Sequence, residues 1–440
     1  MGLKTLARGW REALEGCAAR RPHVLLVPCP GGTGARMAAE AAVARLGGTL
    51  APTPADADVL LVVGEPSGEL CEAVESLWAQ MPGPRVRGRA VLPEAVGGVL
   101  EGLVPRLSGA EQVRDAAGRD DEWSARQEQS GEHAAHRGGN GTHQGHEEDH
   151  HNGGPGAHDA EEQDDGEGEH QEGGTGGHGG HGMRMPGGLG MAETVPDRDG
   201  LTLDVLHVAL GPVLPEWPTG LVLDTVLQGD VVQEARGRVL ASSRASGTVF
   251  WSDAGEPATR RRRTAACYLD SMGRLLAVAG WQAAARRARA LRDQVLAAEP
   301  DGGLRTEFAR WRRRVERSAL LRWSTDGVGV LSPERATRLG VGGPAARAGA
   351  PGDVSARWRQ WLVETDALLS GAPVPEEGPR GGALRGGGPP SQALLDAVLE
   401  LLPGLELAAA RLVVASFDPD PDEWCAVPPS PVRPEREEKR

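Results

Sequence analysis

The stretch HVLLVPCPGGTGARMAAEAAVARLGGTLAPTPADADVLLVVG, residues 23–64, decides the fold class of the first part of the chain. Apolar runs without alternating polar residues lie at its two ends, 23–28 and 57–64. Between them, 35–47 is an alanine-rich segment of helical composition that ends in glycines. Strands that are apolar on both faces and separated by helices are typical of a parallel sheet covered on both sides. The stretch therefore predicts an α/β domain.

The same alternation of strands and helices continues to residue 108. The pattern predicts helices over 68–81 and 93–107 and a weaker third strand over 85–92. We therefore expect a three-layer α/β domain over 22–108. Before it, residues 1–21 have the pattern of an amphipathic helix, which either packs on its own domain or docks on a membrane surface or a partner.

The turn PCPGGTGAR, residues 28–36, follows a strand and opens a helix. Backbone N–H groups of such a turn can hold an anion, and ligands of parallel sheets bind at the carboxyl ends of the strands. The turn lacks the Lys-Ser/Thr pair of a phosphate-binding loop, so a purely structural turn is the alternative. The cofactor-binding candidates in this turn are Cys29, Gly31, Gly32 and Gly34.

Residues 109–190 are rich in glycine, histidine and acidic residues and nearly free of apolar ones. Such a segment cannot offset its ordering entropy by burial, so we predict a disordered linker. Imidazoles beside carboxylates bind zinc or nickel, and weak binding is expected here; a solvated spacer is the alternative. The metal-binding candidates are His143, His146, His150, His151, His178 and His181.

Residues 191–417 predict an α+β domain, with a sheet first and a helical bundle after it. Two strand-like runs flank Gly229 and Asp230 as in a tight hairpin, and 248–252 is a candidate third strand. Apolar residues at helical spacing predict helices over 264–297, 304–323, 354–369, 391–402 and 404–416. The Pro- and acid-rich end, 418–440, is predicted to be a flexible tail.

The 440 residues suffice for two or three domains, and the formal net charge is −14. The five cysteines include no C-x-x-C pair, which favours a reduced cytoplasmic compartment, and no apolar run is long enough to cross a bilayer. Arginines at 260–263, Arg286, Arg287, Arg289 and the stretch 310–314 predict solvated faces or docking to an acidic partner or the chain's own linker. No base-reading motif accompanies them, so no nucleic acid is expected.

His23 and His207 lie in apolar strands and are predicted to be buried.

One family resemblance covers APTPADADVLLVVGEPSGELCEAVESLWAQMPGPRV, residues 51–86. The strand ADVLLVVG, followed by a helix that ends in QMPGPR, resembles the cluster-binding small subunit of respiratory complex I and of membrane-bound nickel–iron hydrogenases. A second resemblance, to the large quinone-site subunit, covers LHVALGPVLPEWPTGLVLDTVLQGDVVQEA (206–235), AACYLDSMGRLLAVAG (265–280) and ARLVVASFDPDPDE (410–423). The last of these resembles the closing strand of that subunit.

In this family the two subunits pack together and form the quinone pocket between them, so the resemblance implies a fusion of both in one chain. The small subunit holds an iron–sulfur cluster with four cysteines, but here only Cys29 stands at the first of those places and none follows Arg85 within the domain. Leu214 stands where the large subunit has the histidine that contacts the quinone headgroup. An iron–sulfur cluster is therefore not expected, and no other cofactor is predicted.

The resemblance and its departures lead to one leading hypothesis. The chain would be a redox-silent accessory, regulatory or assembly component of a complex I- or hydrogenase-like NADH–quinone oxidoreductase system, acting by protein–protein docking and not catalytic by itself. One alternative is an electron-transfer or quinone-reactive subunit of such a system. Another is a His-rich nickel- or zinc-handling protein for metalloenzyme maturation. We expect it in the cytoplasm, with the inner face of the cell membrane, reached through a partner complex, as the alternative.

Overall fold

The computed structural model describes residues 21–109, 112, 193–196, 202–241, 249–251, 255–375, 380 and 389–426. All but the last residue of the helix predicted over 1–21, nearly all of the linker with its six candidate histidines, and residues 427–440 lie outside the described residues. Below, residues 21–109 are called the parallel-sheet part and residues 202–426 the helical part.

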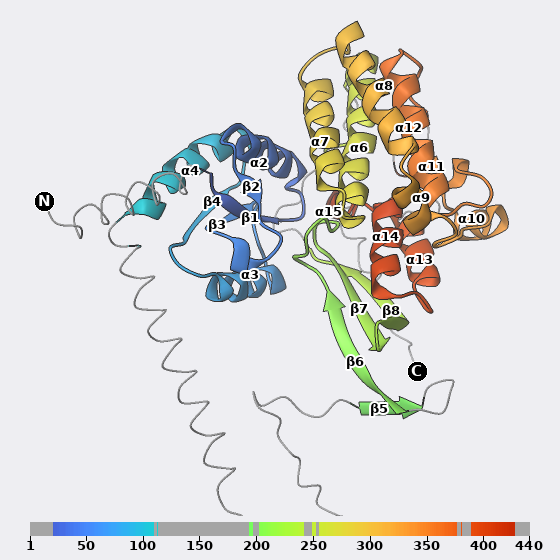
Figure 1. The fold of residues 1–440 in the computed structure, drawn as a ribbon, viewed down its shortest axis with the longest axis horizontal. Coiled ribbons are helices and arrows are strands. Elements are labelled where there is room, and N and C mark those ends of the chain that lie inside the picture. The colour runs from blue at the N-terminus through green and yellow to red at the C-terminus, as the bar shows by residue number, and fades with distance from the viewer. Residues whose placement is uncertain are drawn as a thin grey trace, which may run out of the picture. The chain divides into compact units, whose positions relative to one another are not determined.

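The parallel-sheet part contains four strands: β1 (His23–Pro28), β2 (Thr49–Leu50), β3 (Val59–Val63) and β4 (Val86–Ala90). They pair in parallel in the order β2-β1-β3-β4 (Figure 1). The α/β class is confirmed, and β2 is a short strand at the sheet edge that the sequence pattern does not reveal.

Helices cover both faces of this sheet, because successive residues of a strand point to opposite sides. Val59, Leu61 and Val63 of β3 pack with α2 (Thr33–Arg45) and α4 (Val96–Leu103). Leu60 and Val62 pack on the other side with α3 (Glu69–Gln80). Short 3-10 turns occupy Pro54–Asp56, Pro93–Ala95 and Val104–Ser108. The three-layer arrangement is confirmed.

The second sheet is antiparallel, with strands in the order β5-β6-β7-β8. Its strands are β5 (Glu193–Pro196), β6 (Thr202–Leu210), β7 (Leu221–Gln228) and β8 (Val231–Val239). The predicted hairpin is confirmed, with Gly229 at a positive φ of 61° in its turn. The strand expected over 248–252 is wrong: residues 249–251 do not pair with a strand, and Trp251 is buried in the helical core instead.

A bundle of helices follows this sheet in the helical part, as predicted (Figure 1). The predicted helix over 264–297 is two helices, because Gly280 takes a positive φ of 81° and reverses the chain. The predicted helix over 304–323 is likewise interrupted, at Ser318, whose hydroxyl caps the second helix by accepting from Leu321 N. The helices are α6 (Pro257–Val278), α7 (Gln282–Ala297), α8 (Gly302–Glu316), α9 (Ala319–Thr325), α10 (Pro333–Leu339), α11 (Gly343–Arg347), α12 (Val354–Leu369), α13 (Ser391–Leu401), α14 (Leu407–Phe417) and α15 (Asp422–Ala426).

The end of the helical part differs from the family resemblance. Where a closing strand is implied over 410–423, α14 forms a helix that packs on α6 and α12. The helix predicted over 404–416 from its apolar spacing is thus confirmed, and only the strand implied by the resemblance is wrong. The segment after it, 418–426, was expected to be flexible, but Asp418, Asp420 and Asp422 are buried. No helix among the described residues is long and apolar enough to span a bilayer.

Candidate functional site

The turn between β1 and α2 holds the four residues predicted to bind a cofactor. Cys29 N donates to Val63 O at 2.8 Å, and Gly32 N donates to Cys29 O at 2.9 Å. A Cβ on Gly32 would lie 2.8 Å from the carbonyl oxygens of both Cys29 and Val63. A Cβ on Gly64 would lie 2.8 Å from Cys29 Cβ. Only glycines therefore fit here, because the turn packs directly against the end of β3.

A carboxylate of the chain itself occupies the anion position of this turn. Gly31 N donates to Asp422 Oδ1 at 2.7 Å, and Thr33 Oγ1 donates to Asp422 Oδ2 at 2.6 Å. Asp422 is buried and belongs to the C-terminal segment that follows α14. The turn of the parallel-sheet part thus binds an anionic group, as predicted for its geometry, but that group is a carboxylate of the helical part. Binding of a cofactor at Gly31 or Gly34 stays a prediction and would require Asp422 to be displaced.

The sulfur donors near Cys29 do not fit an iron–sulfur cluster. Burial raises the pKa of Cys29 to about 12, although Arg89 opposes the shift, whereas cluster ligation needs thiolates. Cys71 is exposed on α3, and Cys267 is buried in the core of the helical part, on α6. These three free cysteines belong to three different elements, and the family's adjacent pair of ligands is missing from the sequence.

The strongest concentration of buried charge lies where α2 meets α6 and α7. Arg36 on α2 donates to Asp270 on α6 at 2.7 Å and to Glu40, one turn along its own helix, at 2.5 Å. Arg292 on α7 donates through Nη1 to both Glu40 and Asp270, at 2.7 Å each. Four side chains from three helices are therefore joined by short, charge-assisted hydrogen bonds. These contacts connect the parallel-sheet part to the helical part.

Arg274, one helical turn after Asp270, extends these contacts to the C-terminal segment. It donates to Asp270 at 2.9 Å and to Asp418 at 2.5 Å. Arg380 donates to Asp418 at 2.7 Å, and its Nη1 lies 2.9 Å from Asp420 Oδ2. We call the connected set the ion network; it consists of Arg36, Glu40, Asp270, Arg274, Arg292, Arg380, Asp418 and Asp420.

Two carboxylates of the ion network are held ionised by arginines. Burial alone would raise the pKa of Glu40, but Arg36, Arg292 and Arg289 hold it at about 2. Burial likewise opposes ionisation of Asp270, yet Arg36, Arg274 and Arg292 keep its pKa well below the ordinary value. Both groups stay charged near neutral pH because each faces several guanidinium groups at short range.

Asp420 is the carboxylate of the ion network with the opposite shift. Burial raises its pKa to about 7, and Asp422 and Glu423 add to the rise, while Arg380 opposes it. Although Arg380 lies close, Asp420 Oδ2 makes no hydrogen bond of good geometry to any described group. The pKa of Asp420 is raised because it is buried and shares one arginine with a second carboxylate, Asp418.

The ion network was not predicted, because its partners lie far apart in sequence. Arg36 and Asp270 are separated by 234 positions and Arg292 and Glu40 by 252. The prediction that the arginines of α7 lie on a solvated face is wrong for Arg289, which pairs with Glu216 and approaches Glu40. The signal in the sequence is a charged residue inside an apolar helical run, as with Asp270 in AACYLDSMGRLL.

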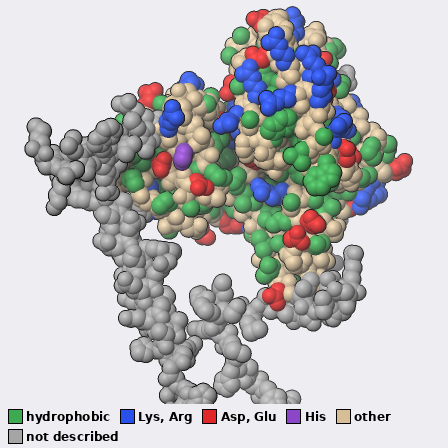
Figure 2. Space-filling model, viewed as in Figure 1, with side chains coloured by type: hydrophobic (Ala, Val, Ile, Leu, Met, Phe, Trp, Pro, Cys, Tyr) green, Lys and Arg blue, Asp and Glu red, His purple; other side chains and the backbone are tan. Residues whose placement is uncertain are grey.

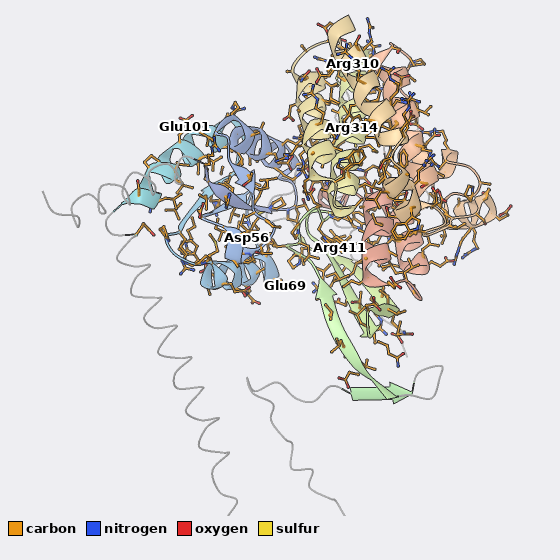
Figure 3. All side chains as sticks on the ribbon, in the orientation of Figure 1. Asp56, Glu69, Glu101, Arg310, Arg314 and Arg411 are labelled. Carbon is orange, nitrogen blue, oxygen red and sulfur yellow. The ribbon has the colours of Figure 1, made fainter. Side chains whose placement is uncertain are left out.

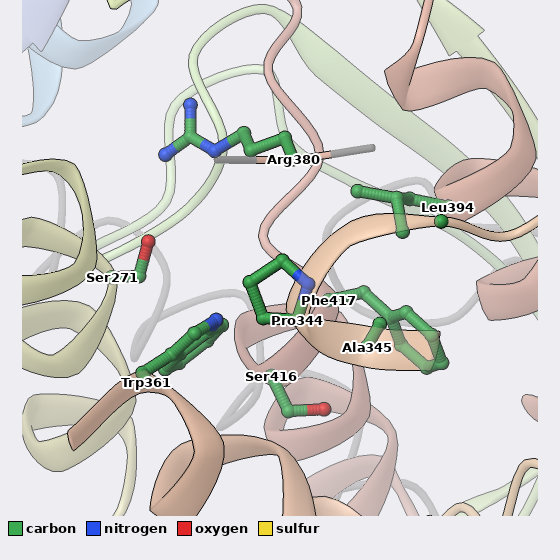
Figure 4. A pocket seen from close by; sticks show the side chains of 9 residues that line it. Ser271, Pro344, Ala345, Trp361, Arg380, Leu394, Ser416 and Phe417 are labelled. Atoms are coloured by element: carbon green, nitrogen blue, oxygen red, sulfur yellow. The ribbon is translucent and has the colours of Figure 1, made fainter. Parts of the chain in front are cut away.

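A pocket lies beside the ion network in the helical part (Figure 4). Its empty volume is ≈ 260 Å³ including open solvent, below the range of about 300–1,000 Å³ typical of ligand sites. Its lining residues are Ser271, Gly342, Pro344, Ala345, Trp361, Arg380, Leu394, Ser416 and Phe417. The pocket is thus a weak candidate for a ligand site.

The structure does not place the predicted metal ligands, since all six candidate histidines lie outside the described residues. Among the residues that are described, no group of three or more His, Cys, Asp or Glu is arranged to hold a metal ion. His23 and His207, predicted to be buried, are both exposed on their strands, so that prediction is wrong. His23 is exposed because it is the first residue of β1, and on β6 the neighbouring Leu206 is exposed as well as His207.

No family model matches the chain, and no curated protein matches it. Part of the chain is similar in structure to a chain of the membrane-bound sulfane sulfur reductase, an archaeal respiratory membrane complex. The likeness covers 50% of this chain and 98% of that chain, with 16% identity and a TM-score of 0.38. The chain thus has a weak structural neighbour in a respiratory membrane complex, and a likeness this distant carries no argument about activity.

Proposed function

We propose that the chain is a redox-silent fusion of small- and large-subunit-like domains that acts by docking to a complex I- or hydrogenase-like membrane complex. Its role there is accessory, regulatory or in assembly. The proposal rests on the sequence resemblance of both parts and on the ion network. Where the family's two subunits would enclose cofactor and quinone between them, this chain has interlocked charged side chains.

The ion network supports a structural use of the junction. Its arginines and carboxylates satisfy one another, and Asp422 fills the turn that contains Cys29. A redox centre at this place needs sulfur donors and room, whereas the donors here are carboxylates and guanidinium groups already paired at 2.5–2.9 Å. This filled junction is the observation that carries the proposal.

A second set of contacts supports a fixed arrangement of the two parts. Arg238 on β8 donates to both carboxylate oxygens of Glu69 at the start of α3, at 2.7 Å each, and to Asp224 at 3.1 Å (Figure 3 labels Glu69). Ser67 Oγ donates to Ala241 O at 2.9 Å beside it. These exposed bonds contribute little energy singly, but they orient the parts at a place separate from the ion network.

The turn that replaces the family's quinone-contacting segment is also filled. Trp217 is buried, and its Nε1 donates to Leu221 O at 2.8 Å. A Cβ on Gly211 would lie 2.2 Å from that same oxygen, so the backbone packs closely here. Leu214, in the place of the family's histidine, offers no polar group to a quinone. This supports docking rather than quinone chemistry.

The docking proposal is tested by purifying the affinity-tagged full chain from its native host under mild detergent. We expect subunits of a complex I- or hydrogenase-like complex to co-purify in fixed ratio, as measured by mass spectrometry. A chain recovered alone, or only with unrelated proteins, would contradict the proposal.

A further inference from the structure

The two consecutive helices α8 and α9 carry a surface that the proposed function does not use. Residues 302–325 contain seven arginines and only two glutamates, although the whole chain is acidic. Figure 2 shows Lys and Arg side chains gathered where Figure 1 places α7 and α8. We call the exposed part of this surface the Arg–Trp patch; it consists of Arg310, Arg313, Arg317, Leu320, Arg322 and Trp323.

Helical spacing directs the arginines of the patch away from the core. Phe308, Trp311 and Val315 form the buried side of α8. Arg310 and Arg313 lie opposite this side, and Arg317 continues the same line at the helix end (Figure 3 labels Arg310). The arginines therefore form one exposed row.

The arginines of the patch are not neutralised within the part of the chain that the structure describes. Nearby, Arg287 of α7 pairs with Glu307 of α8, and Arg312 of α8 pairs with Glu316 and Asp366. By contrast, the side chains of Arg310, Arg313, Arg317 and Arg322 have no ion pair or hydrogen bond to any described residue. Their charge is available to an anionic surface.

Two large apolar side chains protrude beside this row. Leu320 is 71% exposed and Trp323 is 81% exposed, at positions i and i+3 of α9. The opposite side of α9 is fixed, because Leu321 is buried and Thr325 Oγ1 accepts from Trp358 Nε1 at 3.2 Å. A rigidly held Trp and Leu that face solvent together mark an interaction site.

We propose that the Arg–Trp patch binds the surface of an anionic lipid bilayer. A bilayer presents phosphates above acyl chains, so arginines and a neighbouring Trp and Leu meet matching chemistry at adjacent depths. Tryptophan is enriched at this interface because its ring is apolar and its N–H is polar. An acidic protein would match the arginines but would also need a socket shaped for Trp323 and Leu320. This inference is independent of the docking partner proposed above.

The test is co-sedimentation of the full chain with vesicles, in EDTA so that metal on the histidine tract does not contribute. One set is phosphatidylcholine alone and the other contains phosphatidylglycerol as well. We expect binding to the anionic vesicles only, weakened by salt. Arg310→Gln with Arg313→Gln and Arg317→Gln should lower the partition coefficient at least about tenfold, and Leu320→Ser with Trp323→Ser should lower it without changing the salt dependence.

The matched control carries Arg45→Gln, Arg106→Gln and Leu92→Ser, exposed positions of the parallel-sheet part. This variant should bind the vesicles like the unaltered chain. Circular dichroism verifies that every variant is folded. The proposal is overturned if the unaltered chain does not bind anionic vesicles, or if the control loses as much binding as the patch variants. Binding to soluble polyglutamate but not to vesicles would overturn it and assign the patch to an acidic protein.

Discussion

Cys29 is the residue on which cluster chemistry in this chain would depend. It is fully buried, and its pKa of about 12 leaves a thiolate fraction on the order of a thousandfold below that of an ordinary cysteine. Iodoacetamide at mildly alkaline pH should therefore alkylate the exposed Cys71 in the native chain and leave Cys29 unmodified until the chain is unfolded. Peptide mapping by mass spectrometry measures both rates in one sample. Comparable native-state rates at the two positions would be inconsistent with this structure.

Asp420 predicts a distinct pH dependence of stability. Its folded-state pKa of about 7 lies above the ordinary 3.8, so the folded state binds the proton more tightly, and this residue lowers stability as pH rises between those values. Asp420→Asn removes that dependence. The free energy of unfolding of the variant minus that of the unaltered chain should increase from pH 5 to pH 8, by at most about 3 kcal/mol. Urea titrations at several pH values measure it, and a difference that does not change with pH contradicts the assignment.

At the scale of elements, buried ion pairs at the junction of α2, α6 and α7 join the parallel-sheet part to the helical part. Arg292→Met would leave Glu40 and Asp270 buried with one fewer partner, which costs about 3–5 kcal/mol. Arg287→Met on the same helix removes an exposed pair with Glu307 and should cost less than about 1 kcal/mol. Denaturant titration compares the two. Equal losses would show that the buried contacts of Arg292 do not join the helices.

Sequence patterns predict the elements well where burial leaves one clear pattern. Burial on both faces of a sheet leaves the unbroken apolar runs of β1 and β3, and burial along one helix face leaves the periodicity of the helix over 354–369. The pattern does not predict a helix boundary where the helical spacing of apolar residues continues across it, as at Gly280 between α6 and α7. The strand implied over 410–423 was wrong, since the resemblance of a few residues there does not fix the backbone.

The pairing within the ion network could not be predicted from the sequence. Asp270 stands out as a charged residue in an apolar helical run, but only the packing of α2 against α6 and α7 brings Arg36 and Glu40 to Asp270 and Arg292. The absence of the family's cluster-binding cysteines, in contrast, can be predicted from the sequence alone, because a missing ligand residue is visible without a structure. Metal binding by the histidines of 109–190 stays a prediction, as these residues are not described.

At the scale of the whole molecule, polar contacts among the described residues connect the parallel-sheet part and the helical part at three places. These are the ion network, the bond from Gly31 to Asp422, and the contact of Arg238 with Glu69. In each place a charged or polar group of one part is paired with a group of the other. These paired contacts are consistent with the proposal that the molecule is one scaffold that presents surfaces to partners.

Iron and acid-labile sulfide content, measured on the full chain purified and reconstituted without oxygen, tests this central claim most directly. With Cys29 protonated and buried and no adjacent pair of cysteines, we predict no stoichiometric iron or sulfide and no reducible paramagnetic signal. A brown preparation with stoichiometric iron and sulfide, and a paramagnetic signal that appears on reduction, would contradict the account.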